Sequence, residues 1–189
     1  MREMQVMGYG SPAIAFHWVT AALVVAAFTL GPGGSETRVY APENDFDRAL
    51  HETLGLTVLT LTVLRLAWKS VLPSPPLPPI APWMNRISKL VQALLYILLV
   101  ITPLSAISGA WLEGHPLTLG VLGSVPPLLA KNAPLGHEIA DIHGTLGDAI
   151  LWLAGLHAVA ALFHHFVLRD DVLLSMFPAR WRSAVRRRA

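Results

Sequence analysis

The chain has 189 residues, of which 53% are hydrophobic and only 14% are charged, and its net charge is +2. A soluble domain carries closer to a quarter charged residues, so this composition excludes an ordinary soluble protein and predicts an integral membrane protein. The chain contains no cysteine. Disulfides, iron–sulfur clusters, thiolate haem ligation and covalent c-type haem attachment are therefore excluded.

The apolar residues gather in four runs, at about 13–30, 50–72, 84–112 and 139–168. Each run approaches or exceeds the roughly 20 residues that a helix needs to cross a bilayer. Helices are expected because backbone polar groups must find partners within the segment in lipid. The proline-rich segment 73–82 is expected to be a stiff linker. The pattern predicts an all-α, antiparallel up-down four-helix membrane bundle that forms a single domain over residues 1–189.

The basic residues predict the orientation of this bundle. With four spans, both termini lie on one side, and that side collects eleven of the 14 lysines and arginines, whereas the other receives Arg38, Arg48 and Lys131. The positive-inside rule then places both termini in the cytoplasm. These basic residues flank membrane spans, so we expect contact with membrane lipid and no nucleic-acid partner. A cleaved signal peptide in the first run is disfavoured, because no small-x-small cleavage site follows it.

Four histidines lie inside or at the mouth of these runs. His143 and His157 are 14 residues apart in the fourth run, which places them roughly 21 Å apart along a helix and within about 40° of one face. His17 and His51 begin the first and second runs. Because imidazoles are costly in lipid, histidines at two depths indicate a bound cofactor at each depth.

The predicted topology gives each histidine a depth. His51 and His143 lie toward the outside and are called the outer pair, and His17 and His157 lie toward the cytoplasm and are called the inner pair. No other pairing of the four matches in depth. Each pair is expected to hold one haem b through its two axial positions, which makes two haems per chain. Hydrogen-bonded imidazoles without a cofactor are the alternative.

Three further residues share the faces of these histidines. Gly55 and Gly147 each follow an outer-pair histidine by four residues, which leaves room for a flat macrocycle or simply allows close helix packing. Arg65 lies 14 residues after His51, at the cytoplasmic level. It is expected either to pair with the haem propionates of the inner site or to be a boundary residue that extends to the membrane surface.

The remaining histidines carry weaker predictions. His164 and His165 fall where the fourth run meets the cytoplasm, and we expect a solvated interfacial pair there, with a quinone or proton contact as the alternative. His115 and His137 lie in the loop between the third and fourth runs, and we expect them to face water. This loop, nearly uncharged between its flanking glutamates, is expected to lie on the outer membrane surface or to cover a site.

Several segments resemble the bacterial cytochrome b-561 family, the four-helix membrane cytochromes related to hydrogenase cytochrome b subunits. The matching segments are FHWV around His17, LHETLGLTVLTLTVLRLAWK from Leu50 and IHGTLGDAILWLAGLHAVAALFHHFVLRDDVLLSMFP from Ile142. The resemblance implies two b-type haems with bis-histidine ligation, carried onto the four paired histidines. It also implies location in the bacterial inner membrane and electron exchange with ubiquinone or menaquinone.

The expected function is transmembrane electron transfer, with a donor or periplasmic redox partner outside and quinone near the cytoplasmic end. Some members of the family oxidise superoxide at the outer haem, which makes a superoxide:quinone oxidoreductase one alternative. The acidic loop between the first two runs would repel that anion. A haem-bearing membrane anchor subunit of a hydrogenase or dehydrogenase would also fit these features. So would a transporter or proton channel that uses the histidines as a relay without any chromophore.

Overall fold

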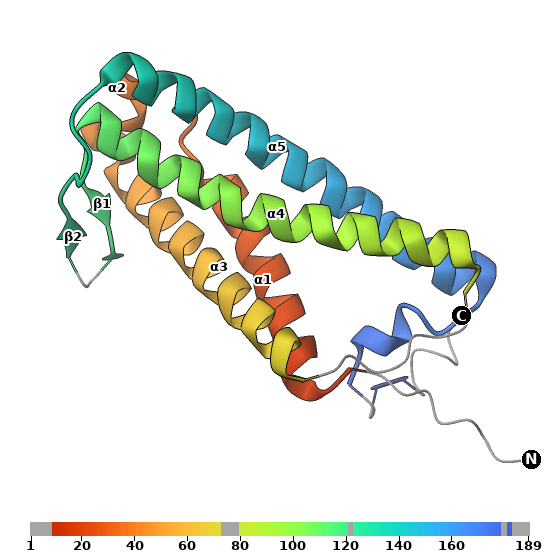
Figure 1. The fold of residues 1–189 in the computed structure, drawn as a ribbon. Coiled ribbons are helices and arrows are strands. Elements are labelled where there is room, and N and C mark those ends of the chain that lie inside the picture. The colour runs from red at the N-terminus through yellow and green to blue at the C-terminus, as the bar shows by residue number, and fades with distance from the viewer. Residues whose placement is uncertain (1–8, 73–79, 121–122, 179–180, 183–189) are drawn as a thin grey trace, which may run out of the picture.

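The computed structural model describes residues 9–72, 80–120, 123–178 and 181–182. Four long helices dominate this part of the chain (Figure 1): α1 (Ser11–Leu30), α3 (Asp45–Val71), α4 (Pro82–Glu113) and α5 (Ala133–Phe163). All four are long and apolar enough to cross a membrane. The predicted all-α four-helix membrane fold is therefore confirmed.

Shorter elements join and extend these helices. Between α1 and α3 lie α2 (Glu36–Val39) and the 3₁₀ turn η1 (Pro42–Asn44), and α5 continues into a π-helical turn, η3 (His164–Leu168). A small antiparallel hairpin of β1 (Leu117–Thr118) and β2 (Ser124–Val125) follows α4, with Leu117 opposite Val125 and Thr118 opposite Ser124. A last 3₁₀ turn, η4, spans Leu174–Met176.

Two helices begin earlier than the apolar runs predicted. Helix α3 begins at Asp45, not near residue 50, because Asp45 and Asp47 lie in its first turn, where the helix dipole favours negative charge. Helix α5 begins at Ala133, not near residue 139. The Asn132 side chain caps it by accepting a hydrogen bond from the Leu135 N–H at 3.4 Å, and a proline follows in the first turn. The apolar runs therefore predicted the apolar parts of these two helices and missed their polar first turns.

Each long helix packs against a long helix that is next to it in the sequence. Helix α1 packs on α3, α4 packs on α5, and α3 also contacts α4 (Figure 1). At one end, the Trp18 indole N–H donates to the Met176 carbonyl at 2.9 Å, and the Tyr9 N–H donates to the Ser175 carbonyl at 3.2 Å. The beginning and the end of the described chain thus meet at the same end of the bundle, as an even number of spans requires. The cytoplasmic location of that end remains a prediction.

Some sequence-based predictions fall on residues outside the described ranges. These are most of the proline-rich linker, at 73–79, and the basic residues that carry much of the charge asymmetry, namely Arg2, Arg180, Arg186, Arg187 and Arg188.

Close contact between α4 and α5 depends on small residues. A Cβ atom added to Gly136 would lie 2.7 Å from Glu113 Cγ and 3.0 Å from the Glu113 backbone nitrogen. Gly109 of α4 faces the same crossing, since a Cβ there would lie 3.5 Å from the Gly136 carbonyl oxygen. Small residues let helix backbones approach closely in membranes. The Gly136 position therefore sets how near the two helix ends come.

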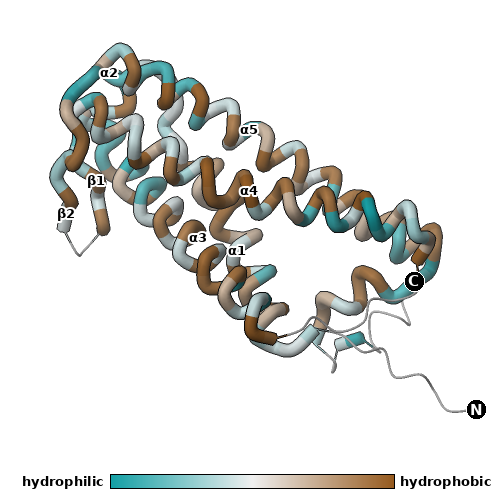
Figure 2. The backbone as a smooth tube through the Cα atoms, in the orientation of Figure 1, coloured by the Kyte–Doolittle hydropathy of each residue, from teal (hydrophilic) through white to brown (hydrophobic). Residues whose placement is uncertain are grey.

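Few apolar side chains fill the interior. Among the described residues, the buried hydrophobic ones are Ile14, Val58, Leu117, Ile150 and Leu174. Figure 2 shows apolar colouring along the long helices and hydrophilic colouring near α2 and the first turns of α5. Large exposed side chains such as Trp152, at 76% exposure, lie on the outside of the bundle, as expected for helices that face lipid. The helices themselves leave space between them at the outer pair.

Candidate haem sites

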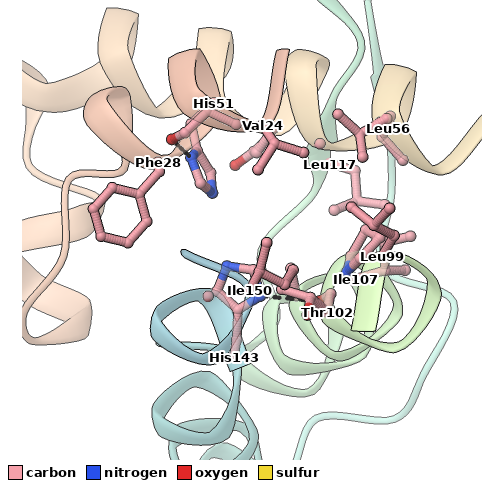
Figure 3. Close-up of a pocket in the computed structure, with 17 residues that line it drawn as sticks. Val24, Phe28, His51, Leu56, Leu99, Thr102, Ile107, Leu117, His143 and Ile150 are labelled. Atoms are coloured by element: carbon pink, nitrogen blue, oxygen red, sulfur yellow. Dashed lines mark hydrogen bonds between the residues drawn. The ribbon is translucent and has the colours of Figure 1, made fainter. Parts of the chain in front are cut away.

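The outer pair meets across a cavity between the helices. His51 of α3 and His143 of α5 face each other with ring centroids 5.9 Å apart and ring planes nearly perpendicular, at 88° (Figure 3). Both rings line the cavity. The structure thus brings together two histidines that are 92 positions apart in the sequence, at the pairing that depth matching predicted.

The end of α1 fixes the orientation of His51. Helix α1 stops at Gly31, so the Ala27 carbonyl is one of the last four carbonyls that lack a partner within the helix. His51 Nδ1 donates to this carbonyl at 2.7 Å. Gly31 permits the contact, because a Cβ atom there would lie 3.3 Å from both Nδ1 and Cε1 of the ring. This hydrogen bond leaves Nε2 as the nitrogen available to another partner.

His143 is oriented in the same way from α4. Its Nδ1 donates to the Thr102 carbonyl at 2.9 Å, next to Pro103 inside the helix. The same carbonyl also accepts a hydrogen bond from the Ser105 hydroxyl at 2.7 Å. In both outer-pair rings Nδ1 donates to a backbone carbonyl, so Nε2 is the nitrogen left for another partner. Histidines that ligate metals commonly show this arrangement, in which the second nitrogen donates to a carbonyl.

The cavity between the outer-pair rings is almost entirely apolar. Its lining comes from all four long helices and the hairpin: Val24, Ala27, Phe28, His51, Glu52, Gly55, Leu56, Val58, Leu99, Thr102, Pro103, Ala106, Ile107, Leu117, His143, Gly147 and Ile150. A Cβ atom added at Gly55 or Gly147 would meet nothing within 4 Å. Both glycines therefore border open space at this cavity, whereas Gly109 and Gly136 serve close helix packing.

The hairpin after α4 covers this cavity at one end. Leu117 is buried and lines it, and the Thr118 N–H donates to a Glu52 carboxylate oxygen at 2.6 Å. The other Glu52 oxygen accepts from Arg48 at 2.9 Å, and Arg48 also pairs with Asp45 at 2.8 Å. The prediction that this loop covers a site agrees with these contacts.

The inner pair forms a second contact of the same kind. His17 of α1 and His157 of α5 have ring centroids 6.3 Å apart and planes at 75°. Trp18 lies edge-on to His17 at 5.2 Å. No hydrogen bond to either ring comes from the residues that the structure describes. The inner pair is therefore positioned by packing, without the Nδ1 contacts that hold the outer pair.

A positive charge lies beside the inner pair. The Arg65 guanidinium is close enough for its charge to act on both His17 and His157. It also lies 5.5 Å from the centre of the Tyr96 ring, which Lys69 approaches at 5.3 Å. Arg65 thus stands at the level of the inner pair, where an anionic group on a bound cofactor would meet it.

Both pairs fit the dimensions of a bis-histidine metal centre. Histidine nitrogens bind first-row metals at about 2 Å, so two imidazoles on opposite sides of one metal ion have centroids roughly 6 Å apart. The measured separations of 5.9 and 6.3 Å agree with this value. The apolar outer cavity with its two exposed glycine backbones also suits a flat macrocycle.

The prediction of a solvated pair at His164 and His165 is wrong. His165 is buried, with 6% of its surface exposed, and His164 Nδ1 hydrogen-bonds the Asp170 carboxylate. Helix α5 widens here into the π-helical turn, which ends at Arg169 in the left-handed conformation with φ of 55°. This turn directs the chain back, so both imidazoles pack against protein.

His115 and His137 were expected to face water. His137 is exposed, as predicted, but the prediction is wrong for His115, which is half-buried. Both donate from Nε2 to Glu36, His115 to Oε1 and His137 to Oε2, each at 2.8 Å. The hydrogen bond from His137, and after it the one from His115, holds the pKa of the Glu36 carboxyl below its usual range. Glu36 is therefore ionised at neutral pH. The sequence shows the acidic loop that contains Glu36 and the two histidines, but no local pattern predicts that they contact one another.

Comparison with known proteins identifies the family. Residues 8–179 match the family model described as prokaryotic cytochrome b561. The chain is 31% identical to cytochrome b561 homolog 1 of Escherichia coli (strain K12), over 91% of this chain and 98% of the relative. It is 32% identical to cytochrome b562 of Cereibacter sphaeroides, over 92% and 97%. It is 27% identical to the probable superoxide oxidase CybB of Yersinia pestis, over 91% and 97%.

These matches extend over nearly the whole chain and include all four long helices. The family is one of b-type haem cytochromes that transfer electrons, and its relatives here are bacterial. With four helices that can span a membrane, the protein is a multi-pass protein of the bacterial inner membrane. The chain belongs to the prokaryotic cytochrome b561 family.

Proposed function

We propose that this protein carries electrons across the membrane between two haem b groups, one held by His51 and His143 and the other by His17 and His157. The observation that carries the proposal is the presence of two facing imidazole pairs, at separations of 5.9 and 6.3 Å, at two levels of one bundle. When bound, haem b supplies a one-electron couple at each level.

The chain's own residues determine how each site works. The two imidazoles of each pair would hold one haem between them, and with both bound the haem would offer no free position to oxygen. The carbonyls of Ala27 and Thr102 accept the Nδ1–H of the outer ligands and raise their basicity. The apolar cavity wall excludes water. Arg65 supplies positive charge beside the inner pair and is assigned to its propionates.

Membrane quinone is the proposed exchange partner at the inner end. Quinone is lipid-soluble, and the inner pair lies between helices that face lipid. Reduction or oxidation of quinone also moves protons, and the His164–Asp170 pair at the end of α5 is the nearby group we assign to proton exchange. The outer pair would then exchange electrons with a donor on the opposite side, such as a periplasmic redox protein.

Haem quantitation and vectorial electron transfer test this proposal together. Pyridine haemochrome analysis of purified protein is expected to give two haems per chain. In proteoliposomes loaded with ferricyanide, an external reductant should reduce the trapped acceptor only when both pairs are intact. His51→Ala and His157→Ala should each keep one haem and abolish transfer. A single haem per wild-type chain, or transfer that survives loss of either pair, would overturn the proposal.

Superoxide is a second candidate donor, because one relative is named a probable superoxide oxidase. Local charge argues against rapid reaction. Arg48, near the outer cavity, is neutralised by Asp45 and Glu52, and Glu36 is ionised. We therefore expect slow haem reduction by an enzymatic superoxide source, with faster reduction at higher ionic strength. Rapid reduction at low salt would support superoxide as the donor.

A further inference from the structure

Four side chains that the haem proposal does not use converge at the α2 end of the bundle. Glu36 comes from α2, Glu113 ends α4, His115 follows it, and His137 lies near the start of α5. We call these four residues the Glu/His cluster. They belong to three segments that are far apart in the sequence, and no run of neighbouring residues produces the contact. The tertiary fold therefore places two carboxylates and two imidazoles together.

The distances within the Glu/His cluster are those of a metal site. Ligand atoms of Glu36, Glu113 and His115 all lie within 4.8 Å of one another. His137 Nε2 lies 2.8 Å from Glu36 and 3.7 Å from Glu113 Oε1. Around a tetrahedral zinc ion with bonds of about 2.0–2.1 Å, neighbouring ligand atoms are roughly 3.4 Å apart. Glu36, Glu113 and His115 therefore need only small side-chain movements to enclose such an ion, and His137 would join them as a fourth ligand from beside the two carboxylates.

Glu113 is the member that most requires a cation. Its side chain is 6% exposed, and it makes no hydrogen bond with any residue that the structure describes. Its nearest ion-pair partner is His137 at 3.7 Å. Its carboxylate borders a polar pocket, where partial burial without hydrogen bonds disfavours the charged form and a bound cation would favour it. Gly136 leaves room for Glu113, because a Cβ atom there would lie 2.7 Å from Glu113 Cγ.

The imidazoles are also held in position. The His115 ring stacks on Tyr40 with centroids 3.4 Å apart and planes at 15°. The Nε2 atoms of His115 and His137 both point at one carboxylate, that of Glu36. In a metal complex, each ring would carry its one proton on Nδ1 and direct the Nε2 lone pair at the ion, which takes the place of the two hydrogen bonds.

A polar pocket beside the cluster provides an entry path. Glu36, Glu113 and His137 line it, together with Gly34, Ser35, Thr37, Ala140 and Asp141. The ligand atoms of the cluster are imidazole nitrogens and carboxylate oxygens without any thiolate. This set favours zinc and similar divalent transition ions over soft Cu(I), and two imidazoles disfavour Mg²⁺ and Ca²⁺.

We propose that Glu36, Glu113, His115 and His137 bind one divalent transition-metal ion of the zinc class. Four protein ligands make a closed, structural site. The ion would fasten α2 to the adjoining ends of α4 and α5, next to the outer pair. This site is independent of the haem proposal, because none of its ligands lines the cavity between His51 and His143.

Zinc binding to the haem-loaded, tag-free protein tests the proposal. After dialysis against a chelator, equilibrium dialysis with Zn²⁺ and metal analysis are expected to give one zinc ion per chain. The double variant His115→Gln with His137→Gln should weaken binding by more than about 100-fold, since changes even outside the ligand set cost 10–100-fold. Glu113→Gln keeps the side-chain volume and should weaken binding about tenfold or more.

A matched control separates the site from general attraction to acidic residues. Glu43→Gln with Asp47→Asn removes one carboxylate of η1 and one of the first turn of α3, both outside the cluster, and zinc binding should be unchanged. The haem absorption spectrum of each variant checks that it is folded. Zinc should raise the melting temperature of the wild type and not that of the His115/His137 double variant. Absence of saturable zinc uptake, or equal uptake by wild type and double variant, would overturn the proposal.

Discussion

In the outer pair, both Nδ1 atoms donate to backbone carbonyls at 2.7 and 2.9 Å, whereas no described residue hydrogen-bonds either ring of the inner pair. The inner pair instead has the charge of Arg65 beside it. A hydrogen bond at Nδ1 fixes the tautomer and makes a ligand more basic, and a nearby positive charge favours the reduced form of a bound cofactor. The contrast therefore predicts a lower potential for the outer haem and a higher one for the inner.

Removing one ligand from each pair should have the largest effect. His143→Ala is expected to eliminate the outer haem and His157→Ala the inner haem, so each variant should retain one of the two proposed haems. Pyridine haemochrome analysis and the reduced spectra measure the remaining haem. If either single variant lost both haems, the two pairs would not be independent sites.

Filling the outer cavity should also act on one pair alone. Gly147 and Gly144 of α5 both have no atom within 4 Å of an added Cβ, but only Gly147 lines the cavity. Gly147→Leu should therefore lose most of the outer haem by steric exclusion and keep the inner haem. Gly144→Leu is the matched control and should retain both. Equal haem loss in the two variants would show that leucine simply disturbs α5.

Neutralising Arg65 should shift only the inner potential. Arg65→Gln removes a positive charge that favours the reduced state, so the inner midpoint potential should fall on the order of tens of millivolts, measured by redox titration. Lys69→Gln is the control, because Lys69 approaches the same Tyr96 ring. An equal shift in the Lys69 variant would mean that Arg65 has no specific role at the inner haem. A shift of the outer haem would contradict the assignment of Arg65.

Disturbing the outer hydrogen bond should give the smallest change. In Gly31→Ala, the new Cβ would lie 3.3 Å from the His51 ring and weaken its bond to Ala27. A loss of about 0.5 kcal/mol in this bond would raise the outer potential by about 20 mV. Gly10→Ala, whose Cβ makes only an ordinary contact at 3.8 Å, is the control at the far end of α1. An unchanged outer potential would mean that this hydrogen bond does not tune the ligand.

Much of the site could be predicted because its rules are local. A 14-residue spacing on one helix sets two depths, and the charge asymmetry of the loops sets which end of each span lies at each depth. The structure brings His51 to His143 and His17 to His157 accordingly, although their role as haem ligands stays a prediction. Helix ends were harder, because the polar first turns of α3 and α5 have no apolar signature.

The amino-acid sequence by itself determined the membrane class and the four helices, because hydrophobic length depends on neighbouring residues alone, and helical spacing predicted how the four histidines pair. Only the tertiary structure decided which backbone carbonyls accept hydrogen bonds from Nδ1 of the outer pair and how His165 becomes buried. It also decided that the residues of the Glu/His cluster converge. Those contacts join segments that are distant in the chain. They depend on where α1 stops and on how closely Gly136 lets α5 approach α4.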